Sequence, residues 1–223
     1  MKINKLILTF TAFTMLALVS CGGGAKKDDK KKDEGKDKGA APGAAAESCT
    51  YFYDSTSTTV KWIAYKFTGK TPVEGKFDSL YLQGCKSGPS MADVLLGATF
   101  TIPVSSLQTG DVEKNKNIID HFFGKLTATV SITGSITEIT ETSATVKVKM
   151  NEMEKEITME CKWEDEKVTA TGSLSIDDFG GQKAIEALNK KCKKNHTGED
   201  GVTKMWPEVT VMVETTLKKE VAE

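Results

Sequence analysis

The chain has 223 residues, of which 39% are hydrophobic and 27% charged, and its formal net charge at pH 7 is −1. A composition so evenly charged argues against a nucleic-acid partner, which requires a net basic face. Residues 48–223 are enough for one domain with a sizeable core.

The N-terminal residues have the pattern of an export signal. Two lysines precede an apolar run from Leu6 to Leu18, which is shorter than the ~20 residues that a membrane-spanning helix needs. The Leu-Val-Ser-Cys quartet that ends at Cys21 resembles a bacterial lipobox. We therefore expect residues 1–20 to be a lipoprotein signal peptide and Cys21 to carry acyl chains such as palmitate, which anchor the protein in a membrane. The alternative is an ordinary secretory signal whose cleavage site adjoins a cysteine.

Residues 21–47 are expected to form the lipidated cysteine and a disordered tether. After Cys21 the segment holds Gly, Ala, Lys, Asp, Glu and one Pro, with no aromatic or branched apolar residue. It cannot bury enough apolar surface to offset its chain entropy. Its lysines could attract anionic lipid headgroups, but the interleaved acidic residues weaken that pull. Gly22 replaces the aspartate that retains some lipoproteins at the inner membrane, which favours the outer membrane, on its periplasmic or cell-surface face.

Residues 48–223 are predicted to be an all-β domain. Apolar and polar residues alternate with a period of two in most segments, which indicates about eight half-buried strands, one of them around Phe77–Leu82. Such strands form a sandwich or a barrel, and we expect an eight-stranded antiparallel barrel of lipocalin-like shape because closure removes exposed edges. The residues expected to face inward are Val60, Trp62, Ala64; Ala98, Phe100, Ile102, Val104; Ala128, Val130, Ile132; Ala144, Val146, Val148, Met150; Ile157, Met159, Cys161, Trp163; Val168, Ala170, Gly172, Leu174, Ile176; Val209, Val211 and Val213.

The sizes of these inward residues bear on whether the barrel is empty. An eight-stranded barrel is either filled by its own side chains or holds one small ligand. Small residues such as Ala64, Ala144 and Gly172 leave room, and the remaining lining has almost no hydrogen-bonding groups, so a cavity here would take an apolar guest. The pattern leaves open the alternative that small and large side chains interdigitate and fill the space.

Several short motifs, in order, resemble the YceI-like family over roughly residues 50–218. They are Val60–Lys66 followed by Val73–Phe77, Ser106–Gly110, the pair Phe122-Phe123, and Ala170–Gly172 followed by Asp178–Gly180. The resemblance implies an extended lipocalin-like barrel in an exported protein, and in some members a polyisoprenoid chain in the interior. The family usually follows Thr-Gly with Arg-Asp-x-His-Leu. This chain has Lys114, Asn115, Asn117 and Ile118 there, so roles that need the arginine or histidine are not carried over.

Two connections depart from the strand pattern. In Ser106–Phe123, the polar run Asp111–Asn117 is expected to stay in water with a turn of helix. The apolar residues that follow it should fold back over the barrel mouth as a lid; these are Ile118, Ile119, Phe122 and Phe123. Segment 181–206 is longer than is usual in the family and is predicted to contain a helix from Lys183 to Lys194.

The cysteines and histidines give few signs of chemistry. Besides Cys21 there are four cysteines, and an even number in an exported chain suggests two disulfides, with free thiols as the alternative. Hairpin order places two of them at one end of the barrel, so the favoured pairs are Cys49–Cys85 and Cys161–Cys192. His121 and His196 have no ligand-spaced partners, so neither a metal site nor a cofactor is predicted.

Three hypotheses for function remain. The first is a lipid-anchored protein that binds or carries a polyisoprenoid or related apolar lipid. The second is a surface interaction protein with a filled barrel that works through segment 181–206, and the third is an enzyme acting on a quinone or isoprenoid. The sequence names no protein partner and does not decide on a homodimer. For the first hypothesis, the predicted ligand-binding residues are Trp62, Ala64, Phe100, Ile102, Phe122, Phe123, Val130, Ile132, Val146, Val148, Met159, Leu174, Val211 and Val213.

Overall fold

The structure is a computed structural model that describes residues 49–221. The expected signal peptide, the lipidation site at Cys21 and the tether lie outside the described residues.

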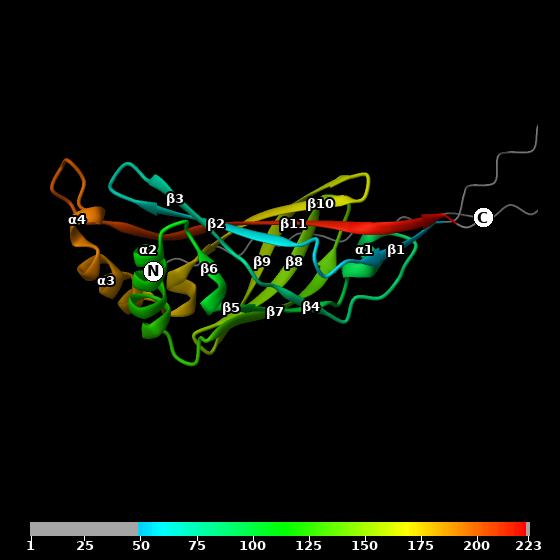
Figure 1. The fold of residues 1–223 in the computed structure, drawn as a ribbon, viewed down its shortest axis with the longest axis horizontal. Coiled ribbons are helices and arrows are strands. Elements are labelled where there is room, and N and C mark those ends of the chain that lie inside the picture. The colour runs from blue at the N-terminus through cyan, green and yellow to red at the C-terminus, as the bar shows by residue number, and fades with distance from the viewer. Residues whose placement is uncertain (1–48, 222–223) are drawn as a thin grey trace, which may run out of the picture. The chain divides into compact units, whose positions relative to one another are not determined.

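One curled antiparallel sheet of eleven strands makes up most of the domain, which confirms the all-β prediction (Figure 1). Neighbouring strands follow the order β4-β5-β7-β8-β9-β10-β11-β2-β3-β6, and β1 pairs with β11 outside this path. The strands are β1 (Cys49–Tyr53), β2 (Thr59–Lys66), β3 (Thr71–Phe77), β4 (Tyr81–Gln83), β5 (Thr99–Pro103), β6 (Leu107–Gln108), β7 (Ser131–Ile139), β8 (Ser143–Met150), β9 (Met153–Glu164), β10 (Lys167–Ser175) and β11 (Met205–Val221).

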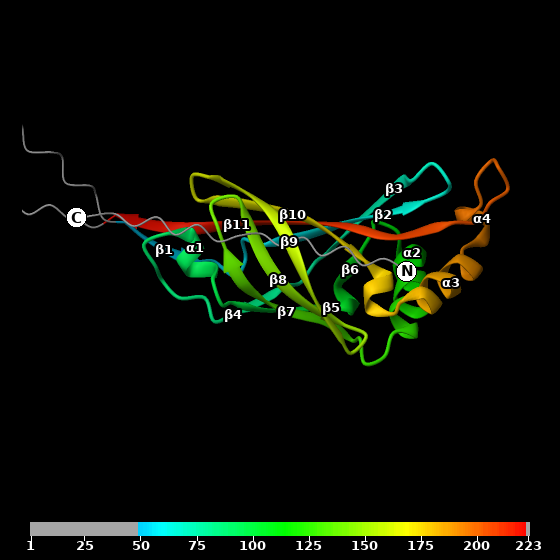
Figure 2. The same cartoon turned by 180° about the vertical axis from the view of Figure 1, so that it is seen from behind.

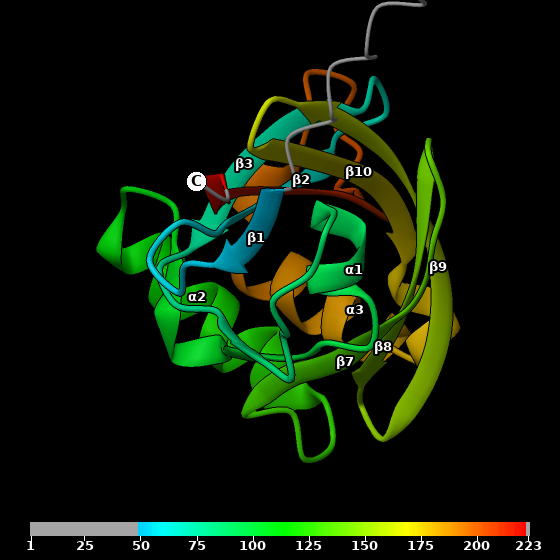
Figure 3. The ribbon, with the colours of Figure 1, turned by 90° about the vertical axis from the view of Figure 1, so that its right-hand side faces the viewer.

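The sheet is an incomplete barrel rather than a fully closed one. Viewed from the end that holds β1, it curves around the interior (Figure 3). Within residues 49–221, no strand pairing joins the two edge strands, β4 and β6. The chain itself makes the join, because β5 continues through the 3-10 turn η1 (Val104–Ser106) into β6, which pairs with β3. The amide of Asp78 donates to the carbonyl of Ser106 at 2.9 Å and extends this contact beyond β3.

Most predicted strands are present, but two predictions are wrong. The strand expected around Phe77–Leu82 does not form, because β3 ends at Phe77 and the chain turns before the separate short β4. The inward position of Val130 is also wrong, since its side chain is 83% exposed. Ala128 adopts a positive φ of 49° in a turn, and β7 begins only at Ser131, so the alternation of Ala128 and Val130 does not belong to a strand.

Helices gather at one end of the barrel. α2 (Val112–His121) and η2 (Phe123–Lys125) connect β6 to β7, and α3 (Gln182–Lys191) and α4 (Lys193–His196) lie between η3 (Ile176–Phe179) and β11. Figures 1 and 2 show α2, α3 and α4 at one end, with α1 (Met91–Leu95) and β1 at the other. The predicted helix Lys183–Lys194 is present as α3 and α4, separated at Cys192.

The core follows the strand period where the strands are long. On β8, Ala144, Val146, Val148 and Met150 are all buried, as expected. The next turn has positive φ at both central residues, Asn151 and Glu152, which is the geometry of a two-residue hairpin that matches strand twist. Asn151 also accepts from the Thr127 amide at 2.6 Å and donates to the Phe179 carbonyl at 2.6 Å. This one side chain therefore ties two connections at the helical end to the sheet.

Candidate functional site

Two cavities lie in series inside the barrel. The large cavity, of about 450 Å³, is at the end with α2 and α3, and the small cavity, of about 180 Å³, lies toward β1. Their order can be followed along β11, where Val209 borders the large cavity, Val213 and Thr215 border the small one, and Val211 borders both. The barrel interior is therefore not filled by its own side chains.

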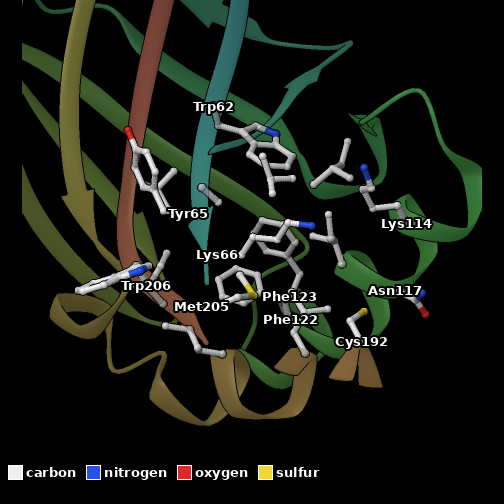
Figure 4. Close-up of a pocket in the computed structure, with 18 of the residues that line it drawn as sticks. Trp62, Tyr65, Lys66, Lys114, Asn117, Phe122, Phe123, Cys192, Met205 and Trp206 are labelled. Carbon is white, nitrogen blue, oxygen red and sulfur yellow. The ribbon is translucent and has the colours of Figure 1, made fainter. Parts of the chain in front are cut away.

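The large cavity combines an apolar wall with a polar rim. Figure 4 shows Trp62, Phe122 and Phe123 around it, with Lys66 and Lys114 nearby. Lys66 Nζ donates to the carbonyl of Asn195 at 3.2 Å, which links the end of β2 to α4. The rim residues are Lys66, Asp111, Glu113, Lys114, Asn117, Asn195 and His196. Charges of both signs and neutral polar groups therefore meet at this one end.

His196 is a neutral member of the rim at pH 7. Burial, and secondarily the nearby charge of Lys66, holds the pKa of its imidazole below the ordinary value. Its Nδ1 lies 2.9 Å from Asn189 Oδ1 on α3, so the ring is positioned by that hydrogen bond. His196 thus offers the rim a hydrogen-bonding group without a charge.

The segment from Leu107 to Lys125 is held against the barrel by capping and aromatic packing. Asp111 caps α2 by accepting from the Lys114 amide at 3.0 Å, and Asn115 Oδ1 accepts from the amide and hydroxyl of Thr109 at 2.8 and 2.7 Å. Phe122 and Phe123 are buried and meet edge to face, with ring centroids 4.9 Å apart. The polar run is thus part of a ten-residue helix, longer than the single turn expected.

Trp62 lies at the junction of the two cavities and borders both. In the pairing of β2 with β3, Trp62 lies opposite Gly75. The indole lies across this glycine so closely that a Cβ there would be 2.1 Å from Cζ2 of Trp62. Gly75 is therefore required for the present position of the indole. The Nε1 of Trp62 is buried and has no hydrogen-bond partner among the described residues.

The small cavity is almost entirely apolar. Its side chains with hydroxyl groups are Thr58, Ser173 and Thr215. Trp163 also borders it, and its Nε1 likewise lacks a partner within the described part of the chain. Because buried polar groups are costly without partners, a space lined in this way suits a hydrocarbon rather than a polar molecule.

The structure gathers the predicted ligand-binding residues around these two cavities, except for Val130. Ala64, Phe122 and Phe123 border the large cavity. Phe100, Ile102, Val146, Val148, Met159 and Val213 border the small cavity, and Trp62, Ile132, Leu174 and Val211 border both. Their contact with a ligand stays a prediction.

A family model described as the YceI-like domain matches residues 51–217. The chain belongs to the YceI-like family. The match includes all the strands that form the two cavities, from β2 to most of β11. The resemblance seen in the order of the sequence motifs is therefore confirmed.

One solved structure shares the fold of this YceI-like protein at low sequence identity, and two others match with TM-scores below 0.5. A polyisoprenoid-binding domain from Saccharophagus degradans, implicated in plant cell wall breakdown, matches with a TM-score of 0.53 and 14% identity over 79% of this chain and 99% of its own. BcnA of Burkholderia cenocepacia matches with a TM-score of 0.45 and 16% identity over 77% and 100%. The YceI protein of Campylobacter jejuni gives 0.44 and 12% over 69% and 86%. A comparison with curated proteins found no match.

The cysteines of this YceI-like domain do not form the expected disulfides. Cys49, Cys85, Cys161 and Cys192 are all free thiols. Cys161 borders the small cavity from β9 and Cys192 borders the large cavity at the end of α3, so different regions of the interior hold the two sulfurs. Burial raises the pKa of the thiols of Cys85, Cys161 and Cys192. These three groups therefore stay protonated at neutral pH and react slowly.

Several cavity residues of the YceI-like domain were missed by the strand-based reasoning. α3 places Ile185, Leu188 and Cys192 against the large cavity, at the three- and four-residue spacing of one helical face. That spacing was readable in the sequence once the helix was predicted. Met205 and Trp206 gave no such signal, because they precede the alternating part of β11.

Residues 49–221 contain no group of three or more His, Cys, Asp or Glu side chains that could hold a metal ion. In the same part of the chain, no helix is long and apolar enough to cross a membrane.

Proposed function

We propose that this protein is a membrane-anchored lipoprotein that binds or carries a long apolar molecule, a polyisoprenoid or related lipid, inside its barrel. The observation that carries the proposal is the pair of cavities in series, about 450 and 180 Å³, lined mainly by aliphatic and aromatic side chains. Transfer of apolar surface from water into such a space supplies about 25 cal/mol per Å² buried. The Saccharophagus degradans domain with the same fold is described as polyisoprenoid-binding, which supports the proposal.

The distribution of polar groups gives the ligand a direction. Charged and amide groups border only the large cavity, where Lys66, Lys114 and Asn117 lie at its rim. The small cavity has no charged side chain among its lining residues. An amphipathic lipid therefore enters with its apolar end toward β1 and keeps its polar group at the helical end, where hydrogen bonds are available.

The alternative of a filled barrel working through segment 181–206 is less well supported. Much of this segment folds onto the barrel, since Ile185 and Leu188 are buried and border the large cavity. We propose that α3 is part of the binding wall. Deletion of residues 184–201 should then abolish lipid retention, whereas an interaction surface would lose only a protein partner.

The decisive experiment extracts the bound lipid. The chain from residue 22 onward contains every described residue. It therefore includes β1 and β11, the first and last strands, which pair with each other. We expect organic extraction of this purified protein, followed by mass spectrometry, to recover one long-chain lipid per protein. An empty extract together with no uptake of added prenols would contradict the proposal.

Lipid anchoring through Cys21 is tested separately. The mature N-terminal peptide should begin at Cys21 and carry the added mass of the acyl chains. Replacement of Cys21 by Ser should remove that mass and release the protein from the membrane fraction. A wild-type peptide with an unmodified cysteine would contradict anchoring and leave the binding proposal intact.

A further inference from the structure

The two cavities meet at a narrow set of shared side chains. The residues that border both are Trp62, Phe77, Ile132, Leu174 and Val211. They come from different strands around the barrel, so together they form a ring between the cavities. Trp62 has the largest side chain of this ring.

The position of the Trp62 indole depends on packing rather than on hydrogen bonding. Its Nε1 has no partner in the described part of the chain, although an unpaired buried N–H is costly. The indole remains there because Gly75 has no side chain, and a Cβ at this position would lie 2.1 Å from Cζ2, 2.5 Å from Cε2 and 2.8 Å from Cη2. Trp62 and Gly75 thus act as a pair across β2 and β3.

The volumes show what this ring does to a ligand. The large cavity, of about 450 Å³, has more than twice the volume of the small cavity, of about 180 Å³. A chain that fits the large cavity needs no change at Trp62, whereas a longer one must pass the indole.

We propose that Trp62 determines the length of the apolar chain that the barrel accepts, by closing the small cavity to the ligand. This inference rests on the proposed binding of an apolar lipid. It makes Trp62 a specificity-determining residue rather than simply part of the lining. Gly75 is the positioning residue that keeps the indole in the passage.

Two native thiols allow the depth of a bound chain to be measured. Cys192 borders the large cavity and Cys161 borders the small one. A chain in the large cavity protects Cys192 from a small thiol reagent such as methyl methanethiosulfonate, and a chain that reaches the small cavity also protects Cys161. Protection at each cysteine is read by peptide mass spectrometry.

The experiment compares a series of prenols of increasing chain length, starting from one of two isoprene units. For the wild type, we expect affinity to stop rising at the chain length that fills the large cavity, with Cys192 protected and Cys161 reacting at the same slow rate as in the lipid-free protein. For Trp62→Leu, we expect the next longer prenol to bind at least about tenfold more tightly than the prenol at that limit, with Cys161 now protected relative to the lipid-free protein.

Two further variants separate the passage from general loosening of the barrel. Trp163→Leu makes the same change from tryptophan to leucine in the wall of the small cavity. Trp163 does not border the large cavity, so this variant should not move the length limit. Gly75→Ala keeps Trp62 but displaces its indole, so it should move the length limit, which Trp163→Leu should leave unchanged. When Trp62 is already replaced by Leu, Gly75→Ala should not further change the longest prenol that the protein accepts.

The possible outcomes distinguish this inference from the proposed function. If the wild type binds no prenol of any length, the proposed function fails and this inference fails with it. If prenols bound to the wild type already slow the reaction of Cys161 relative to the lipid-free protein, or if Trp62→Leu and Trp163→Leu shift the limit equally, only the role of Trp62 is overturned. Because Gly75→Ala retains the tryptophan, it provides the same test if Trp62→Leu does not fold.

Discussion

The ring of Phe123 meets the ring of Phe77 edge to face, with centroids 6.4 Å apart and 68° between the ring planes. Phe77 ends β3 and Phe123 begins η2, so this contact attaches the segment after α2 to the barrel wall. Both rings are buried and both border the large cavity. The aromatic pair Phe122-Phe123 is therefore part of the packed core as well as part of the cavity wall.

Phe123→Ala should lower the free energy of unfolding by about 3–5 kcal/mol, because a buried ring and its edge-to-face partners are lost. Urea denaturation followed by circular dichroism measures this change. Val112→Ala on the same segment is the matched control, since Val112 is 85% exposed and its loss should change stability by less than about 0.5 kcal/mol. Equal effects of the two substitutions would show that the segment is not packed as described.

The double replacement of Phe122 and Phe123 by Ser tests the sequence-based lid hypothesis. A lid that covers only the barrel mouth would affect lipid retention more than stability. Because the rings are 8% exposed, we now expect both to fall, with the retained lipid lost even where the protein is still folded. Lipid content per folded molecule, measured well below the unfolding temperature, gives the result. Full lipid retention in the folded fraction would restrict the pair to a structural role.

The sequence predicted the features that repeat along one strand. On β8 and β10 every second residue is apolar, and Val146, Val148 and Val168 are buried as the alternation requires. The same reasoning allowed a barrel with room for an apolar guest, from small inward residues such as Ala64 and Gly172, but it did not decide between an empty and a filled interior. These features depend on neighbours within a strand, so local pattern is sufficient to find them.

The features that the sequence did not predict depend on contacts between distant residues. The pairing of Cys49 with Val221 at the start of β1 has no local signal, and neither has the position of Trp62 over Gly75. Val130 was misplaced because a positive φ at Ala128 is not visible in an alternating pattern. The disulfides were inferred from an even count of cysteines, which says nothing about where the sulfurs lie.

Asp54 should make the protein less stable in acid. Its pKa is lowered to about 2, first by hydrogen bonds from the amide and hydroxyl of Thr56 and then by Lys218. The unfolded carboxylate has its ordinary pKa near 3.9, so its stabilising effect is present above that pH and lost as pH falls toward 2. Asp54→Asn should flatten this part of the profile, measured by urea midpoints at several pH values. Lys218→Gln should keep most of the slope, because the Thr56 hydrogen bonds remain.

His196 should contribute a second loss of stability, nearer to neutral pH. Its folded pKa is lowered by burial and by Lys66, so the unfolded state takes up a proton first as pH falls below about 6.5. Stability therefore decreases from there down to the folded pKa and no further. His196→Gln should remove this step, and Lys66→Met should reduce it by removing the smaller cause. An unchanged profile in His196→Gln would assign the step to another group.

The cysteines give a direct test of the free-thiol arrangement. Denatured without reductant, the chain from residue 22 should titrate four thiols, since Cys49, Cys85, Cys161 and Cys192 are all free. In the folded protein, Cys161 should react slowly with a maleimide, because its side chain is buried and its pKa is raised by burial. Two missing thiols would reveal one disulfide. Peptide mapping would then identify its partners.

Gly134 is a position where β7 has no space for a side chain. A Cβ there would lie 2.0 Å from the carbonyl oxygen of Lys147 and 2.4 Å from Cζ of Phe100. The carbonyl belongs to β8, which is paired with β7, so it cannot move without disturbing the sheet. Gly134→Ala should therefore cost about 3 kcal/mol or more, the upper part of the range for overpacking.

Gly69→Ala is the matched control for this substitution. Nothing lies within 4 Å of a Cβ at Gly69, in the turn between β2 and β3, so the added methyl meets no neighbour. Gly69→Ala should leave the free energy of unfolding unchanged or raise it by up to about 1 kcal/mol, because alanine lowers the conformational entropy of the unfolded chain. Thermal and urea unfolding of both variants measure the difference. A similar loss in both would mean that the loss does not come from the contacts at Gly134, and a small loss in Gly134→Ala would show that β7 and β8 can separate at this point.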